Sequence, residues 1–319
     1  MPQPRHSFFV LILGRAAYIR NGSEQTMTQE VRQALAICPL DVKREVERLP
    51  AQEAERLEEL RLRVGRAVMY CSGGTEKPLA KLQTTQDLLQ GILAAATGQS
   101  AYASQEMLRC GFVTIAGGHR VGICGTAVRK DGEITTLREI SSVNLRVARK
   151  LHGVGDRAVD FLWTHPFSTL ILGPPGRGKT TLLRDIVRQL SDRFGWRISV
   201  VDERMEVGAC VRGMPQFDLG LHTDILSGTP KAAGIEMLLR AMNPQWIALD
   251  EITATDDVEA IAQASYCGVR FLATAHASSV AELRTRPVYR RLYELGVFQN
   301  LVLITQDRTL RLERVENHA

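Results

Sequence analysis

The amino-acid sequence predicts a mixed α/β chain, with a mostly parallel, helix-covered sheet in its second half and a smaller α+β region before it. From residue 167 onward, short apolar runs alternate with helical patterns, and such alternation builds parallel sheets covered by helices on both faces. Between residues 28 and 150, helix-forming segments precede stretches in which apolar and polar residues alternate between glycine turns. That pattern is typical of half-buried strands.

The chain divides into four stretches. Residues 1–27 are interpreted as a poorly ordered leader, or as the result of a start assigned upstream of Met27. Residues 28–150 form the predicted α+β domain, residues 151–166 a glycine-bearing linker that includes a short helix, and residues 167–319 the α/β domain. A signal peptide is the alternative for the leader, but the apolar run there is shorter than the roughly 7 residues that a signal sequence needs.

The first domain is predicted to begin with helices and to continue as strands. Residues 28–62 are helix-forming, with acidic and basic side chains mixed as on a solvated helix face. Apolar–polar alternation around Gly65 predicts a hairpin, and a second helical stretch follows at 85–97. Two further strands turn at residues 117–118, and a last strand ends at Val147.

The second domain is predicted to alternate strands and helices. Each apolar run is short enough for a strand and is followed by a helical pattern, so consecutive strands are expected to lie parallel, joined by right-handed crossovers. The predicted strands are residues 168–172, 197–201, 246–250 and 269–275, and the predicted helices begin at Lys179, near Ala232, at Asp256 and at Ser279.

Composition narrows the class of protein. Hydrophobic residues make up 45% of the 319 residues and charged residues 24%, which is typical of a globular chain with room for two cores. No apolar run reaches the roughly 18 residues of a membrane-spanning helix, so none is expected. The six cysteines are scattered without paired spacing, which predicts neither zinc nor disulfides and favours a reducing cytosol. The net charge of +5 suits an anionic partner but is too small to identify it.

The most specific motif is GPPGRGKTT, which lies between a predicted strand and a predicted helix. It fits the P-loop pattern Gly-x4-Gly-Lys-Thr. Glycines let several backbone N–H groups point into one concavity beside a helix N-terminus, where an anion is stabilised. Lys179 would reach the β- and γ-phosphates, and Thr180 would offer its hydroxyl to Mg²⁺. The alternative is a glycine-rich turn without a ligand. The predicted nucleotide-binding residues are Gly173, Pro174, Pro175, Gly176, Arg177, Gly178, Lys179, Thr180 and Thr181.

Two acids follow the apolar run 246–249 directly. A buried strand would deliver Asp250 and Glu251 to the carboxyl end of the sheet, where ligands bind in open α/β folds. We expect Asp250 to hold Mg²⁺ and Glu251 to act as the general base toward the attacking water. The alternative is a strand end with solvated acids.

Two other predicted strands also end in polar residues. Asp202, Glu203 and Glu206 follow one of them, and His276 follows the other. The acids are expected to orient the water or the metal, unless they cap a helix or pair with Arg204. His276 would contact the γ-phosphate or report its loss, and a satisfied loop histidine is the alternative.

The order of these motifs resembles that of the secretion-superfamily ATPases of type II and type IV systems and pili, with their Walker A, Asp-box, Walker B and His-box motifs. The segments GFVTIAGGHRVGICG, SSVNLRVARK, VVDERMEVGA and TAHASSVAELRTRP are more closely similar to the stage III sporulation protein AA family, from about residue 28 to the C-terminus. The resemblance implies a RecA-like ATPase core behind an N-terminal domain, with ATP and Mg²⁺ as cofactors. It also implies a homo-oligomeric, hexameric ring, on the mother-cell side of a complex that joins mother cell and forespore. There it would be cytoplasmic and attached to the membrane through an integral membrane partner.

The resemblance also assigns residues by position. Arginines of the N-terminal domain or of a neighbouring subunit complete the sites of this superfamily, and surface charge is the alternative reading of the candidates here. Walker B reads Asp-Glu-Ile-Thr rather than Gly-Glu-Ile-Arg, and the tetracysteine motif of some members is absent, so no structural zinc is predicted. The assignments are Lys179 and Thr180 to Walker A, Glu203 and Glu206 to the Asp box, Asp250 and Glu251 to Walker B, His276 to the His box, and Arg146, Arg149 and Arg240 as candidate arginines.

These observations predict Mg²⁺-dependent ATP hydrolysis by a ring ATPase that powers or gates the sporulation complex. The main alternative is a RecA-like nucleic-acid motor. An aromatic content of 6% and the lack of a basic run interleaved with aromatics argue against a nucleic-acid partner. An ATP-responsive scaffold and a small-molecule kinase are further alternatives, although no acceptor pocket or lid is recognisable for the kinase.

Overall fold

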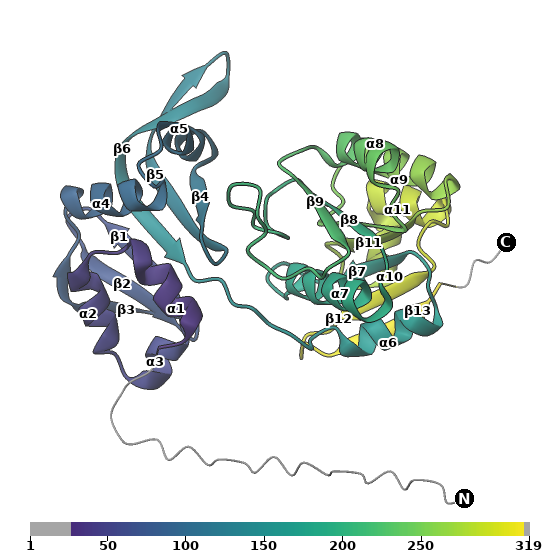
Figure 1. The fold of residues 1–319 in the computed structure, drawn as a ribbon, viewed down its shortest axis with the longest axis horizontal. Coiled ribbons are helices and arrows are strands. Elements are labelled where there is room, and N and C mark those ends of the chain that lie inside the picture. The colour runs from purple at the N-terminus through teal and green to yellow at the C-terminus, as the bar shows by residue number, and fades with distance from the viewer. Residues whose placement is uncertain (1–26, 316–319) are drawn as a thin grey trace, which may run out of the picture.

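The computed structural model describes residues 27–315, in two units that each have their own sheet (Figure 1). We call residues 27–146 the N-terminal unit and residues 156–315 the C-terminal unit, and residues 147–155 connect them. The predictions for residues 1–26 lie outside the described residues. The predicted α/β class is confirmed, since helices accompany both sheets and the second sheet is mostly parallel.

Helices pack against an antiparallel sheet in the N-terminal unit. Its strand order is β3-β2-β1-β6-β5-β4, and each neighbouring pair is antiparallel. Leu60 and Leu145 from the strands share one buried core with Val31, Val42 and Leu89 from the helices. The elements are α1 (Gln29–Ala34), η1 (Leu35–Ile37), α2 (Leu40–Glu47), α3 (Ala51–Glu55), β1 (Leu57–Arg63), β2 (Ala67–Ser72), β3 (Thr75–Gln83), α4 (Gln86–Ala96), α5 (Ala101–Cys110), β4 (Phe112–Ile115), β5 (His119–Lys130) and β6 (Glu133–Arg146).

Residues 28–62, predicted to be helix-forming, contain short helices and then a strand. Pro39 and Pro50 directly precede α2 and α3, because a proline inside a helix lacks the N–H that the helix needs. β1 begins at Leu57 and buries Leu57 and Leu62. The helical prediction was therefore wrong at its end, where apolar residues facing the sheet's core decide the structure over helix propensity. The hairpin predicted around Gly65 corresponds to the antiparallel pair of β1 and β2.

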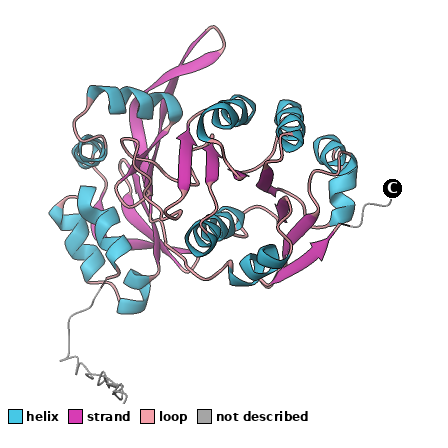
Figure 2. Cartoon of the chain, turned by 45° about the vertical axis from the view of Figure 1, so that its right-hand side comes forward, coloured by secondary structure: helices cyan, strands magenta, loops and turns pink. Residues whose placement is uncertain are grey.

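The C-terminal unit is a seven-stranded sheet, within the described residues, in the order β13-β12-β7-β11-β10-β8-β9. Its neighbours are parallel except β12 and β13. Figure 2 shows helices on both sides of these strands. The elements are α6 (Asp156–Thr164), β7 (Thr169–Leu172), α7 (Lys179–Phe194), β8 (Ile198–Asp202), β9 (Thr223–Ser227), α8 (Lys231–Met242), β10 (Trp246–Leu249), α9 (Thr255–Tyr266), β11 (Arg270–Ala275), α10 (Val280–Thr285), α11 (Pro287–Glu294), β12 (Asn300–Ile304) and β13 (Leu310–Arg314).

Two buried clusters hold the parallel sheet between its helices. All residues of β7, β8 and β10 are buried, as expected for strands covered on both faces. One cluster includes Ile235 of α8 and Ile261 of α9, and the other includes Leu162 of α6 and Ile186 of α7. Residues 156–164, which belong to the predicted linker, are therefore packed into this core.

The predicted strands and helices of the second half correspond to β7, β8, β10, β11, α7, α8, α9 and α10. Sequence reasoning missed β9, whose residues are only partly buried, and the edge pair β12 and β13. Within residues 27–315, no helix has both the length and the apolarity to cross a membrane.

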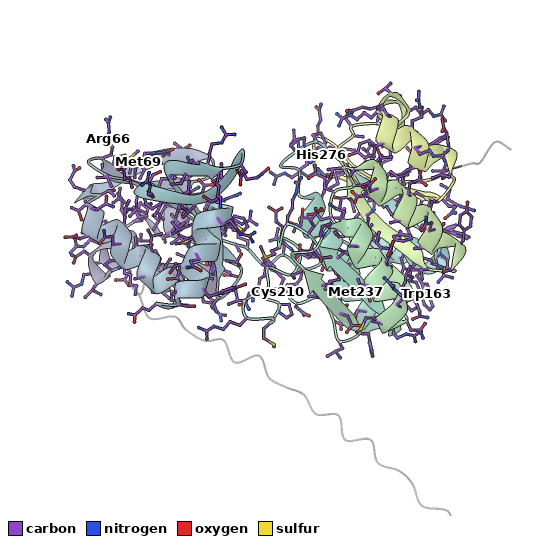
Figure 3. The ribbon with its side chains drawn as sticks, turned by 90° about the horizontal axis from the view of Figure 1, so that it is seen from above. Arg66, Met69, Trp163, Cys210, Met237 and His276 are labelled. Carbon is purple, nitrogen blue, oxygen red and sulfur yellow. The ribbon has the colours of Figure 1, made fainter. Side chains whose placement is uncertain are left out.

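The two units meet where the turn between β4 and β5 touches the loop between β8 and β9 (residues 203–222), here called the β8–β9 loop. Gly117 N donates to Gln216 Oε1 over 2.9 Å. Gly118 has a φ of +80°, and a Cβ there would lie 2.9 Å from the ring of Phe217, so this close approach requires glycine. In Figure 3, Cys210 of the same loop lies between the two units.

Candidate active site

The predicted phosphate-binding motif forms the connection between β7 and α7. Gly176 and Gly178 have φ values of 72° and 90°, a left-handed conformation that other residues rarely adopt. A Cβ on either glycine would meet nothing within 4 Å, so the backbone conformation alone requires them. Gly178 precedes α7 without a side-chain cap, which leaves N–H groups of the first turn available to an anion.

Lys179 is the first residue of α7, and its ammonium group lies inside the loop. Its Nζ donates to Gly173 O over 2.9 Å and to Pro174 O over 3.2 Å, and it lies 2.8 Å from Nδ1 of His276. The residue is 7% exposed. Burial lowers the pKa of Lys179, and the carboxylates of Glu251 and Asp250 partly offset that effect.

Asp250 links the start of α7 to the end of β11. Thr180 Oγ1 donates to Asp250 Oδ2 over 2.9 Å, and Thr274 Oγ1 donates to Asp250 Oδ1 over 2.7 Å. The backbone N–H of Glu251 donates to the same Thr274 hydroxyl over 2.8 Å. The structure thus brings Thr180 and Asp250 together, and a hydroxyl beside a carboxylate is a pair of oxygen ligands that Mg²⁺ accepts.

The carboxylate of Glu251 is held on both of its oxygens. Oε1 lies 2.9 Å from Nε2 of His276, and Oε2 accepts from Nη1 of Arg204 over 2.8 Å. Because Nδ1 of His276 faces the Lys179 ammonium, we assign the ring proton to Nε2, which then donates to Glu251. Glu251 also has a φ of 43°, an uncommon backbone conformation for a residue with a side chain.

The carboxyl end of β8 carries acids with different partners. Asp202 is buried and accepts the N–H groups of Glu206, Val207 and Gly208 over 2.8, 3.0 and 2.8 Å. Burial raises the pKa of Asp202, while these backbone hydrogen bonds act in the opposite direction. This carboxylate organises the start of the β8–β9 loop, much as a capping residue would.

Glu203 and Glu206 have partners outside the phosphate loop. Glu203 pairs with the buried ammonium of Lys231 on α8, and Glu206 pairs with Arg120 of β5 over 2.8 Å. Neither pair brings an acid to the P-loop, so their role in orienting water or metal stays a prediction. The alternative pairing of these acids with Arg204 is not what the structure has, since Arg204 contacts Glu251 instead.

A cavity of about 540 Å³ lies between the two units beside the P-loop. Thr180 and Thr181 line it from the C-terminal unit, and Arg120, Arg146 and Arg149 line it from the N-terminal side. Two of the three candidate arginines therefore line the same cavity as Thr180 and Thr181 in this chain. In Figure 3, His276 lies on the side of the C-terminal unit nearer the N-terminal unit, whereas Trp163 lies on the far side.

The candidate arginines each have a partner of their own. Arg146 Nε lies 3.4 Å from Oε1 of Glu59, and Arg149 Nη2 donates to the backbone oxygens of Glu55 and Leu57. The third candidate, on α8, pairs within its own helix over 3.4 Å and has a side chain that is 78% exposed. That residue, Arg240, is not among the residues that line the cavity.

Sequence reasoning missed Arg184, a partly buried arginine beside the site. Its Nε donates to Val207 O over 3.0 Å, its Nη2 donates to Glu206 O over 2.9 Å, and its guanidinium stacks 3.9 Å from the ring centroid of Phe217. Burial lowers the pKa of Arg184. Its position four residues after Thr180 on the same helix face was a usable signal. Thr274 and Arg120 were missed as well, and only the folded arrangement reveals them.

Comparison with known proteins identifies the family of this chain. A family model described as "Sporulation stage III, protein AA" matches residues 26–313. Stage III sporulation protein AA of Bacillus subtilis (strain 168) is 36% identical over 285 residues, which cover 88% of this chain and 90% of the relative. The chain therefore belongs to the sporulation stage III protein AA family, as its motifs suggested.

Solved structures of ATPases share its fold. The ATPase DotB of Legionella pneumophila matches with a TM-score of 0.58 and 17% identity, over 87% of this chain and 80% of that one. The pilus retraction motor PilT, solved with bound ADP, matches with a TM-score of 0.60 and 16% identity, over 88% and 84% of the two chains. At such identities the similarity establishes a common fold, and the chemistry has to be argued from the residues above.

Proposed function

We propose that this member of the sporulation stage III protein AA family is a Mg²⁺-dependent ATPase with its site at the P-loop. The observation that carries the proposal is one continuous set of contacts. Lys179 contacts His276, His276 contacts Glu251, and Thr180 contacts Asp250. The ends of β10 and β11 and the start of α7 thus converge on the loop that would hold the phosphates.

The residues present fit a nucleotide with magnesium. The uncapped N-terminus of α7 and the ammonium of Lys179 suit the β- and γ-phosphates, and the hydroxyl of Thr180 and the carboxylate of Asp250 are the oxygen ligands proposed for Mg²⁺. Within the described residues, no three His, Cys, Asp or Glu side chains gather as a ready-made metal site. The ion would therefore depend on the phosphates and water for its remaining ligands. When bound, it neutralises charge that develops on the phosphate oxygens.

The chain's own groups supply positioning and proton transfer. A water held beside Glu251 would attack the γ-phosphorus, the bond to the ADP oxygen would break, and Glu251 would accept the proton of the water. His276 orients that carboxylate through its Nε2–H. Lys179 would exchange a carbonyl partner for a phosphate oxygen, and its charge would stabilise the transition state.

The wider role follows from family membership and is part of the proposal. We assign the N-terminal unit as an N-terminal domain and the C-terminal unit as a RecA-like ATPase domain, which includes α6 from the predicted linker 151–166. They would assemble as a hexameric ring with Arg146, Arg149 or Arg240 completing sites between subunits. The ring would work in the mother cell, held at the membrane by an integral membrane partner, and would power or gate a complex between mother cell and forespore. Family membership and the shared fold support this placement.

Nucleotide titration and turnover of the full chain test the proposal. We expect Mg²⁺-ATP to bind the wild type with measurable heat, and Lys179→Ala to lose that binding, because a phosphate would lose the ammonium group that lies inside the loop. Lys77→Ala is the matched control, since Lys77 lies on β3 and pairs with Glu53 in the N-terminal unit. Wild-type protein that is folded but gives no heat with Mg²⁺-ATP contradicts the proposal.

A further inference from the structure

Arg204, in the β8–β9 loop, forms an ion pair with Glu251. Its Nη1 donates to Oε2 over 2.8 Å, while the opposite oxygen of the carboxylate contacts His276. The side chain of Arg204 is 54% exposed and that of Glu251 is 19% exposed. The contact therefore joins a solvent-accessible arginine to a largely enclosed carboxylate.

The backbone at Arg204 is tied to the N-terminal unit. Arg120 of β5 donates from Nη2 to Arg204 O over 3.4 Å and pairs through Nη1 with Glu206 over 2.8 Å. From the other side, Asp202 holds the N–H groups of the residues that follow Glu206. Movement of β5 relative to the parallel sheet would thus act on the short segment that carries Arg204.

The contact has a direct chemical consequence for proton transfer. A carboxylate that accepts a charge-assisted hydrogen bond on each oxygen has one acceptor position of each oxygen occupied and its negative charge stabilised. It is then poorly placed to take a proton from water. An ion pair with an exposed partner is also weak, so it can open without a large barrier. The contact with Arg204 would therefore restrain Glu251 as a base, and the weakness of the ion pair would let that restraint be released.

We propose that Arg204 is a positioning residue that restrains Glu251, and that Arg120 sets this restraint according to the position of the N-terminal unit. The inference rests on the proposed function, in which Glu251 is the general base. With the N-terminal unit docked as in this structure, Arg204 occupies one oxygen of the base. When β5 withdraws and Arg120 releases the loop, Glu251 keeps its contact with His276 and gains a free oxygen for the water.

The first test is the turnover of Arg204→Ala in the full chain with saturating Mg²⁺-ATP. We expect kcat to rise by up to about fivefold, the rate equivalent of one exposed ion pair, while KM stays unchanged because Arg204 contacts no predicted phosphate-binding residue. Arg204→Lys retains a cation and should stay nearer to the wild-type kcat. The matched control is Arg63→Ala, which removes an arginine–glutamate pair of 2.9 Å between β1 and β3 and should leave kcat unchanged.

The second test asks whether Arg120 acts through Arg204. We expect Arg120→Ala to raise kcat in the same direction. Combined with Arg204→Ala it should add nothing further, since both remove the same restraint. Additive effects of the two substitutions would overturn the coupling.

The outcomes separate this inference from the function on which it rests. If Glu251→Gln is inactive while folded Arg204→Ala has a kcat equal to or below the wild type, the restraint is wrong and the ATPase proposal stands. If Glu251→Gln hydrolyses ATP as fast as the wild type, the general-base role fails, and the restraint with it. Absence of turnover in both the wild type and Arg204→Ala also overturns the restraint, because removing it should reveal activity.

Discussion

The carboxyl ends of β8 and β10 are neighbours in the sheet, and both carry acids, yet the acids have different surroundings. β8 pairs in parallel with β10, so Asp202 and Asp250 follow the same edge. Asp250 contacts Thr180 of the phosphate loop, whereas Asp202 is enclosed by backbone N–H groups of its own loop. Two aspartates at the carboxyl ends of neighbouring strands therefore have different roles in our proposal: Asp250 belongs to the proposed site, and Asp202 anchors its own loop. What packs above each strand decides the difference.

The largest expected effect is a loss of turnover on substitution of Glu251, which follows β10. Glu251→Gln keeps the size of the side chain and one acceptor oxygen but removes the negative charge and the ability to accept a proton from water. We expect kcat to fall by roughly 10²- to 10⁴-fold, with nucleotide affinity close to that of the wild type. Steady-state turnover and calorimetric titration measure the two quantities. If Glu251→Gln retained the turnover of the wild type, Glu251 would not be the general base, and the two strand ends would no longer differ in their proposed roles.

A substitution at the carboxyl end of β8 should lower the free energy of unfolding. Asp202→Ala leaves three backbone N–H groups without their acceptor in a buried place, and one such group costs about 1 to 3 kcal/mol. We expect the free energy of unfolding to fall by about 3 kcal/mol or more, measured by urea denaturation. Asp224→Ala, at an exposed position on β9, is the control. A variant as stable as the wild type would contradict the role of Asp202 as the anchor.

We expect acid to lower the stability of the folded chain through His119 at the start of β5. His119 is buried beside Arg120, and its Nδ1 accepts the N–H of Ala148 in the connecting segment over 3.0 Å. Burial lowers the pKa of His119 to about 4, and the charge of Lys150 adds to that effect. Because the folded chain favours the neutral ring, its stabilisation is present above the unfolded pKa of about 6.5 and is lost as the pH falls toward 4. We expect a loss of roughly 3 kcal/mol across that range.

Thermal unfolding between pH 4 and pH 7 measures the effect of His119. The variant His119→Gln lacks the titrating ring, so the part of the pH dependence that comes from this residue should disappear from its unfolding curves. An identical pH dependence in both proteins would show that other groups cause the acid sensitivity.

The smallest expected effect concerns Glu206, the acid of the β8 end that reaches the N-terminal unit. Because its partner is Arg120 rather than a P-loop residue, we expect Glu206→Gln to change kcat by less than about tenfold, far less than Glu251→Gln, since a partly exposed ion pair is weak. Parallel turnover measurements on the two variants check this. A loss as large as that of Glu251→Gln would place Glu206 in the chemistry after all.

Much of the second half could be predicted, because its signals are local. The glycines and Lys179 determine a loop conformation by themselves, and the apolar runs before Asp202 and Asp250 mark strands whose ends must share one edge. The helical prediction over residues 28–62 failed in its last part, where burial of Leu57 decides for a strand. The edge strand β9 escaped notice because partly buried strands lack a clear apolar pattern.

The sequence by itself determined the motifs, the α/β class and the kind of ligand that an amide-lined loop with one lysine can hold. Tertiary structure alone decided the partners of each side chain. It paired Arg204 with Glu251, Glu203 with Lys231 and Arg120 with Glu206. The first two pairs form within the C-terminal unit, and the third joins the two units. The physical reason is that backbone conformation depends on neighbouring residues, whereas ion pairs between residues distant in the chain depend on how strands and loops pack together.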